Sequence, residues 1–499
     1  MTSIKSLRYT ILHFLFSWWH RLLNRWHLIL RPGVVLGTLF LAVIIGLLVA
    51  QGRVKAELLL AVLVAPSGLL ILYRLGRFEY GILLILLSAG AIRFAISATQ
   101  WSKIVTSLMV TMGLVGIWLL QMLLYDKKIQ VKPSPLNKPL LTFIAVSIIA
   151  YLWGNIFRDP LVILWGSFPI VQVAALMVNI LLPILTLLVA NKIQEVKWLK
   201  WLTVILLSLG TIAIIAREFG LSALTHDVYP FARNFIFALH DRGLFVAWVG
   251  ALAYALALFD ESLSWQKRGL LLALVAAWVH YSFILSSSWV TGWLPLMVTC
   301  AAITFMRSKK LFLLVGIIGS IYLMINFNYY WETIVLAEEA EGSGTERVTL
   351  WERNLDHIVK HPLFGMGPAG YAVYNMTYHP EDARSTHNNY FDIAAQTGII
   401  GLGVFLWLFI TFIRMAGKLR QALSGHRNFE EAFANAAQGA CIGAMVAMML
   451  GDWVLPFAYN QGIAGFDNAS YTWLFLGAMV SLYHIVKAKG NTSQRTLPE

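Results

Sequence analysis

The chain has 499 residues, of which 59% are hydrophobic and only 13% are charged. This composition excludes a soluble globular protein of this size and predicts a chain that folds in lipid. The net charge of +13 fits either nucleic-acid binding or a membrane protein with basic cytoplasmic loops, so its distribution along the chain has to decide.

Apolar stretches long enough to cross a bilayer recur along nearly the whole chain. A hydrocarbon core of about 30 Å needs roughly 20 apolar residues in a helix, and the alternating polarity of barrel strands is absent. The sequence therefore predicts an all-α, polytopic membrane protein with about fourteen transmembrane helices. The predicted spans are 33–50, 57–73, 80–98, 104–124, 139–153, 170–190, 201–216, 243–259, 269–286, 290–306, 311–327, 392–413, 432–450 and 469–486.

These spans divide the chain into five parts. Residues 1–32 are basic and aromatic and lead into a full-length span, which predicts a cytoplasmic or interfacial segment rather than a cleavable signal peptide. Residues 33–327 hold the first eleven spans, and residues 328–391 form one large extracytoplasmic loop. Residues 392–486 hold the last three spans, and residues 487–499 form a cytoplasmic tail.

The basic residues predict the orientation. With the N-terminus inside, the inside segments hold 26 of the 38 Lys and Arg, the outside segments hold 11, and Arg93 lies within the third span. Such a bias marks cytoplasmic loops, so it predicts a multi-pass protein of the cytoplasmic (inner) membrane with both termini inside, and no nucleic-acid partner. The inside loops are too short for a domain, which leaves the outside segments 154–169, 217–242 and 328–391 as candidates for function.

Several classes of function have little support. Cys300 and Cys441 lie in apolar runs, which favours neither a disulfide nor a thiolate metal site. The outside segments lack a compact group of His and carboxylates with ligand spacing, so we expect no metal. Charges within spans are scarce, with Arg93 and Asp392 the main cases, and no internal repeat is visible, which makes a transporter or flippase the weaker alternative.

The large loop begins with a predicted helix over residues 343–362. Ser343 with Glu346 fits a capping box, and Pro362 stops the helix. Apolar residues recur at spacings of three and four, namely Val348, Trp351, Leu355 and Ile358. The glycines of 365–370 then match a dinucleotide-binding pattern, but neither a preceding strand nor a βαβ unit supports it, so we expect a tight backbone turn.

A histidine stands at the outer start of the twelfth span. Arg384, His387, Asn388 and Tyr390 come directly before this span. A helix N-terminus favours anions through its free N–H groups and its dipole, so this end of the loop is a candidate phosphate site. Tyrosines of the loop could stack on sugars, although anchoring at the membrane interface is the preferred interpretation of Tyr371, Tyr374, Tyr378 and Tyr390.

Two segments of the chain together resemble a known family. The run from Arg347 through Trp351 to HPLFGMGPAGY (361–371), followed by STHNNYFDIAAQTGIIGLGVFL (385–406), resembles the core motif of the O-antigen ligase and O-antigen polymerase family. The number of spans and the position of the loop agree with it. The resemblance implies a metal-independent glycosyltransferase, without cofactor, that takes a glycan from an undecaprenyl-pyrophosphate carrier outside the cytoplasmic membrane and joins it to an acceptor hydroxyl.

The resemblance also implies roles for individual residues. A family Arg at the start of the loop helix matches Arg347, and a family His before the next span matches His387. A further family Arg usually follows a Ser between the ninth and tenth spans, but Ser288 is followed here by Trp289. Other outside arginines could supply this cation. The candidates are Arg217, which begins an outside loop at the membrane end and is preferred, Arg233, Arg242, Arg384, and Arg93 if it reaches the headgroup level.

The chemistry of the two matched residues leaves alternatives open. His387 fits a general base, because imidazole titrates near neutral pH, but it also fits a phosphate-binding cation or a helix cap. Arg347 presents a planar fork of donors that suits a diphosphate, or it forms an ion pair with Glu346 or Glu352. Asn388 and Tyr390 are further candidate contacts to the pyrophosphate or the glycan.

The resemblance does not separate three branches of the family. A ligase would use an acceptor such as the lipid A core of lipopolysaccharide, a polymerase another carrier-linked repeat, and a third branch a protein hydroxyl. In each case the expected partners are a lipid-linked glycan donor, a hydroxyl acceptor and membrane lipids.

Overall fold

The structure, a computed structural model, describes residues 77–92, 95–97, 103–220, 243–332, 343–380, 385–459 and 462–494. Within these ranges the chain is mostly helical, which confirms the predicted class there. The segment 1–32 and the predicted spans 33–50 and 57–73 lie outside the described residues.

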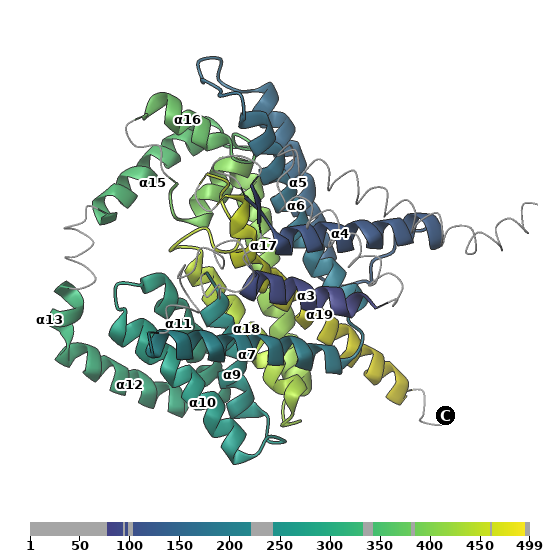
Figure 1. Cartoon of the computed structure of the whole chain (residues 1–499), viewed down its shortest axis with the longest axis vertical. Helices are drawn as coiled ribbons and strands as arrows, with labels where there is room; N and C mark the ends of the chain where they lie inside the picture. The colour runs from purple at the N-terminus through teal and green to yellow at the C-terminus, as the bar shows by residue number, and fades with distance from the viewer. Residues whose placement is uncertain are drawn as a thin grey trace, which may run out of the picture. The chain divides into compact units, whose positions relative to one another are not determined.

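The helices follow one another in the predicted order (Figure 1). They are α3 (Phe78–Ala91), α4 (Thr106–Leu120) with the π-helical turn η1 (Gln121–Tyr125), α5 (Asn137–Ile156), α6 (Phe168–Lys192), α7 (Val196–Glu218), α9 (Phe245–Phe259), α10 (Trp265–Val279) with the π-helical turn η2 (His280–Leu285), α11 (Val290–Arg307), α12 (Lys309–Ile325), α13 (Phe327–Tyr330), α15 (Ser343–Lys360), α16 (Gly370–Tyr378), α17 (Asn389–Leu423), α18 (Phe429–Ala447), the 3-10 turn η4 (Ile463–Gly465) and α19 (Phe466–Gln494).

Eight helices in the described part of the chain are long and apolar enough to cross a membrane. They cover Thr106–Leu124, Asn137–Ile156, Phe168–Lys192, Val196–Glu218, Trp265–Leu285, Val290–Arg307, Asn389–Leu423 and Ile463–Lys489, and each overlaps a predicted span. α3 and α9 are shorter apolar helices at two further predicted ranges. α12 and α18 are helices where 311–327 and 432–450 were predicted. The total of fourteen spans stays a prediction.

The third predicted span, 80–98, is only partly helical. α3 ends at Ala91, and β1 (Ala95–Ser97) pairs antiparallel with β2 (Lys103–Val105), with Ala95 opposite Val105. The branched residues Ile96, Ile104 and Val105 favour an extended backbone at this point. Prediction of an uninterrupted helix over 80–98 was therefore wrong in its last third.

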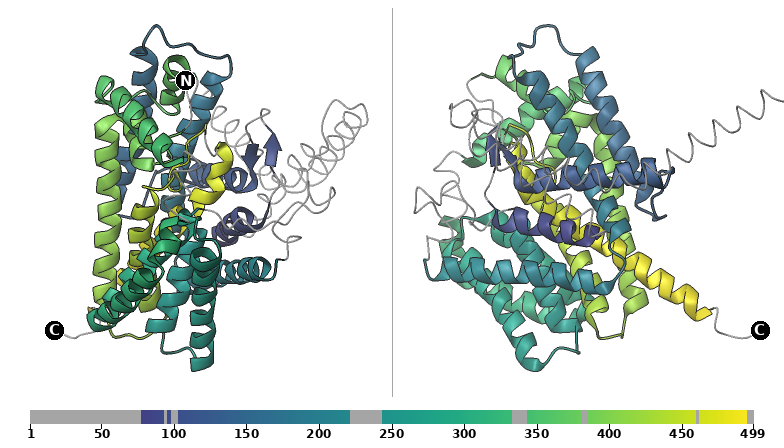
Figure 2. Two further views of the ribbon diagram at one scale, coloured as in Figure 1. Left: turned by 90° about the vertical axis from the view of Figure 1, so that its left-hand side faces the viewer. Right: turned by 45° about the vertical axis from the view of Figure 1, so that its right-hand side comes forward.

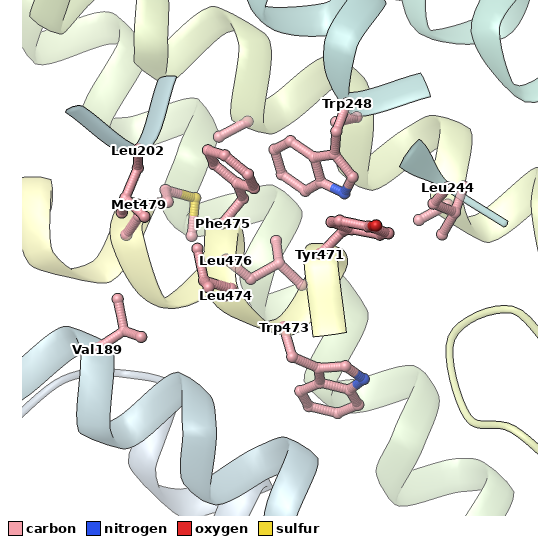
Figure 3. Packing of buried hydrophobic residues seen from close by; sticks show 14 of the residues in the cluster. Val189, Leu202, Leu244, Trp248, Tyr471, Trp473, Leu474, Phe475, Leu476 and Met479 are labelled. Atoms are coloured by element: carbon pink, nitrogen blue, oxygen red, sulfur yellow. The ribbon is translucent and has the colours of Figure 1, made fainter. Parts of the chain in front are cut away.

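The main core is built around α19. The ring of Trp248 on α9 stacks on Phe475 with centroids 5.1 Å apart, and its Nε1 donates to Thr472 Oγ1 at 3.1 Å (Figure 3). The hydroxyl of Tyr471 donates to the carbonyl of Ala89 on α3 at 2.8 Å. Helix association in lipid depends on close packing and on such interhelical hydrogen bonds, so α19 joins several helices into one bundle.

α17 is the long helix that carries the end of the loop into the bundle (Figure 2). It is interrupted at Gly398, whose φ of +70° is a conformation that favours glycine. Glycine is also required sterically, because a Cβ there would lie 2.0 Å from the carbonyl oxygen of Leu363. The residues around Gly365, with φ +66°, fill the interruption. Met366 N donates to Ala395 O at 2.9 Å, and Ile399 N donates to Pro362 O at 2.8 Å. The glycine segment is thus the tight turn that the sequence predicted.

A second, smaller apolar cluster supports this turn and α16. Tyr371 is fully buried and stacks on Phe457 with centroids 4.2 Å apart. Met366, Ala372 and Ala395 are buried in the same cluster. The loop after α15 is therefore packed onto the end of the bundle, which gives its side chains defined positions.

Candidate active site

α15 confirms the predicted loop helix and ends at Lys360, directly before His361 and Pro362. Its buried face combines apolar and polar residues. Leu350 and Ile358 are buried, together with the polar residues Asn354 and His357, whereas Val348 and Leu355 are about half exposed. Periodicity indicated the helix, and of its four apolar residues Ile358 is buried and Trp351 is half-buried, because apolar residues occur on both faces of α15.

Trp351 joins α15 to the start of α17. Its Nε1 donates to the carbonyl of Thr386 at 2.8 Å, and its ring stacks on Phe391 with centroids 5.6 Å apart. Arg347 lies one helical turn before Trp351, on the same side of α15. Thr386 directly precedes His387. Arg347 and His387, to which the resemblance assigns catalytic roles, therefore lie in the same part of the structure.

His387 adopts an unusual backbone conformation. Its φ of +50° lies in the left-handed region, which residues other than glycine seldom enter. Its N–H donates to Ser385 Oγ at 3.2 Å, and the side chain is partly exposed. The conformation turns the chain sharply between the loop and α17, so the imidazole stands at the N-terminal end of that helix.

A buried carboxylate holds this turn. Asp392 Oδ1 accepts from Thr386 Oγ1 at 2.5 Å and from the hydroxyl of Tyr371. Burial raises the pKa of Tyr371 well above its ordinary value, so the phenol stays protonated and serves as a donor. Asp392 Oδ2 is buried and has no hydrogen-bond partner among the described residues. The sequence offered Asp392 as a rare charge within a span and as an alternative base, and the network that it organises was missed.

The residues beside His387 mainly hold the helix. Asn388 caps α17 by accepting the N–H of Tyr390 at 2.9 Å, and the Tyr390 hydroxyl donates to Met445 O at 2.8 Å. Asn389 donates from Nδ2 to Leu455 O at 2.7 Å. Substrate contacts of Asn388 and Tyr390 stay predictions.

Arg217 belongs to a different cluster, at the end of α7. Its Nη1 donates to the hydroxyl of Tyr281 at 3.0 Å. Its guanidinium carbon lies 5.4 Å from the centroid of Tyr281 and 5.8 Å from that of Trp289. The cation thus stands next to the position where the resemblance expects an arginine and the chain has a tryptophan. The other arginine candidates, Arg93, Arg233, Arg242 and Arg384, lie outside the described residues.

The comparison with protein families identifies the segment that contains this site. Residues 272–406 match the family model described as O-antigen ligase. The match includes Trp289, Arg347 and His387, and it confirms the resemblance that the sequence motifs indicated. The segment is an O-antigen ligase family domain. A comparison with curated proteins gave no match.

Together with the apolar helices, the family domain indicates a multi-pass membrane protein that processes glycans as ligases or polymerases do.

Proposed function

We propose that the protein is an O-antigen ligase-like glycosyltransferase of the cytoplasmic membrane. It transfers a glycan from undecaprenyl pyrophosphate to an acceptor hydroxyl on the outer side, in the synthesis of lipopolysaccharide or another surface polysaccharide. The main support for this proposal is the Trp351–Thr386 hydrogen bond, because it joins the helix that bears Arg347 to the residue directly before His387.

The transfer needs one base and at least one cation. The acceptor oxygen attacks the anomeric carbon, the bond from this carbon to the diphosphate oxygen breaks, and the hydroxyl proton moves to the imidazole of His387. The departing diphosphate keeps the electron pair of the broken bond. Arg347 stabilises its growing negative charge through two parallel N–H donors. Asp392 acts through Thr386 to position His387.

We assign the second cation to Arg217. Trp289 occupies the position of the family arginine, and the Arg217 guanidinium stacks beside it from α7. Contacts with aromatic faces hold a guanidinium in place without removing its positive charge. The charge would then be supplied from another helix at the same location.

Arg217→Gln should lower kcat/KM for the lipid-linked donor roughly 10- to 100-fold, as expected for the loss of a hydrogen bond from a charged group. Arg158→Gln is the matched control, because Arg158 lies in another predicted outside segment and pairs with Asn155. Initial rates at varied donor concentration check this. Unchanged kinetics of Arg217→Gln would exclude the assignment.

An assay without a membrane separates a transferase from a transporter. Purified protein in detergent should join a lipid-linked glycan to its acceptor, because group transfer needs no gradient. A flippase would act only across a sealed bilayer. Activity that appears in vesicles and is lost in detergent, with the protein still folded, would contradict the proposal.

A further inference from the structure

A pocket of about 490 Å³ lies at the C-terminal end of α15, away from Arg347 and His387. Its walls come from α15, from α16 and from the loop that joins α5 to α6, which Figure 1 shows near α16. The lining includes Asp356, His357 and Lys360 of α15, and His361, which directly follows the helix. A volume of this size fits a small ligand rather than a single water or ion.

The α5–α6 loop is tied to α16 at this pocket. The hydroxyl of Tyr378 donates to Asp159 Oδ2, and the backbone N–H of Asp159 donates to the Tyr374 hydroxyl at 3.1 Å. The N–H of Ile163 donates to Thr377 Oγ1 at 3.0 Å. These hydrogen bonds fix the walls of the pocket, which come from two segments far apart in the sequence.

Aromatic rings form the inner wall. The ring of Tyr374 lies edge-on to His361 and His357, with centroids 5.1 Å and 5.7 Å apart. His357 Nε2 lies 3.1 Å from Asn375 Oδ1, which ties the imidazole to α16. Tyr378 is less buried than Tyr374 and stands at the edge of the pocket, with about two-fifths of its surface exposed.

The charge in the pocket does not suit a diphosphate. Burial lowers the pKa of His357 and of His361, so both imidazoles are neutral near pH 7. Lys360 is paired with Asp356 at 2.7 Å. The hydrogen bond from Tyr378 lowers the pKa of Asp159, which stays ionised. His379 also lines the pocket, but a charge on it together with that of Lys360 would only balance the two carboxylates, so no positive charge is in surplus for an anion. No group of three or more His, Cys, Asp and Glu side chains in the described ranges could hold a metal ion.

We propose that this pocket binds a neutral or amino sugar unit of the glycan substrate, away from the bond that reacts. Carboxylates and imidazoles accept and donate hydrogen bonds to sugar hydroxyls, while the Tyr378 ring packs against the apolar face of the sugar. This inference rests on the proposed function for the source of the sugar.

The separation along α15 supports a subsite distant from the reacting bond. Arg347 and Asp356 are nine positions apart on α15, which corresponds to about 14 Å at about 1.5 Å per residue. A glycan held at its reducing end near Arg347 would have to extend beyond its first sugar to reach the pocket. The pocket would therefore select for chain length or for the identity of a more distant sugar.

Binding of simple sugars tests the pocket directly. The full-length protein, in a detergent without a sugar headgroup, is titrated with methyl glycosides of neutral and amino hexoses and with inorganic pyrophosphate, and saturation-transfer NMR reports binding. At least one glycoside should bind, roughly tenfold more weakly in Tyr378→Ala, because the stacking ring is lost. Tyr378→Phe should keep that binding, since it removes only the hydroxyl that contacts Asp159.

Controls distinguish a ligand contact from a structural role. Tyr329→Ala removes an exposed tyrosine outside the pocket and should bind as the wild type does. Equal loss in Tyr378→Phe and Tyr378→Ala would assign Tyr378 to holding the α5–α6 loop, and it would overturn the proposal. So would no binding of any glycoside, or pyrophosphate binding that depends on Tyr378.

Transfer kinetics identify the source of the sugar and keep the two proposals apart. Tyr378→Ala should raise KM for a donor with a long glycan but not for a donor with a single sugar. If KM rises instead for a long acceptor, the acceptor supplies the sugar. Sugar binding without any glycan transfer would support the sugar-binding pocket but contradict the proposed transferase function. Glycan transfer whose KM is unchanged in Tyr378→Ala with every substrate would contradict the sugar-binding pocket alone.

Discussion

His387→Ala should lower transfer turnover by roughly two to four orders of magnitude, the contribution expected of a general base. Affinity for the donor should stay close to normal, because removing the base affects the transition state more than the bound ground state. The measurement is single-turnover transfer with purified protein, together with donor binding. His426→Ala, in the loop between α17 and α18, is the matched control.

The left-handed backbone of His387 requires a second variant. Asn tolerates positive φ better than most residues, so His387→Asn preserves the turn while it removes the base. Loss of activity in both variants supports the base role. Near wild-type turnover in both would leave His387 as a residue that shapes the start of α17. The base would then be sought among Glu346, Glu352 and Asp392.

Arg347→Lys should lower kcat/KM roughly 10- to 100-fold, although the charge is kept. Lysine lacks the fork of parallel donors that holds two phosphate oxygens, and the hydrogen bonds to a charged group are lost. Arg353→Lys is the control, because Arg353 lies on the same helix but on another side from Arg347. Full activity of Arg347→Lys would mean that charge alone suffices and that no bidentate contact is made.

The sequence predicted the parts of the site that depend on local signals. Pro362 predicted the end of the loop helix, which ends at Lys360, and the glycines of 365–370 predicted the tight turn. Both could be predicted because each effect arises within a few residues of the sequence. The proximity of Arg347 and His387 was implied by the family resemblance. Its structural basis, the Trp351–Thr386 bond, spans 35 positions of sequence and could not be read from periodicity.

Long-range contacts account for what the sequence missed. Asp159 and Tyr378 are 219 positions apart, so neither suggested a shared pocket. Tyr371 was a candidate for sugar stacking, but its ring is fully buried against Phe457 and its hydroxyl serves Asp392. Arg217 was already the preferred substitute cation on sequence grounds, but its contact with Tyr281, 64 positions away on η2, appears only in the structure.

The most direct test of the central claim is the stoichiometry of one turnover. Purified wild-type protein in detergent, with lipid-linked donor and acceptor, should release one undecaprenyl pyrophosphate for each new glycosidic bond, and His387→Ala should release almost none on the same timescale. Glycan transfer without release of the diphosphate carrier, or release without a new glycosidic bond, would contradict the account of a transferase whose base is His387.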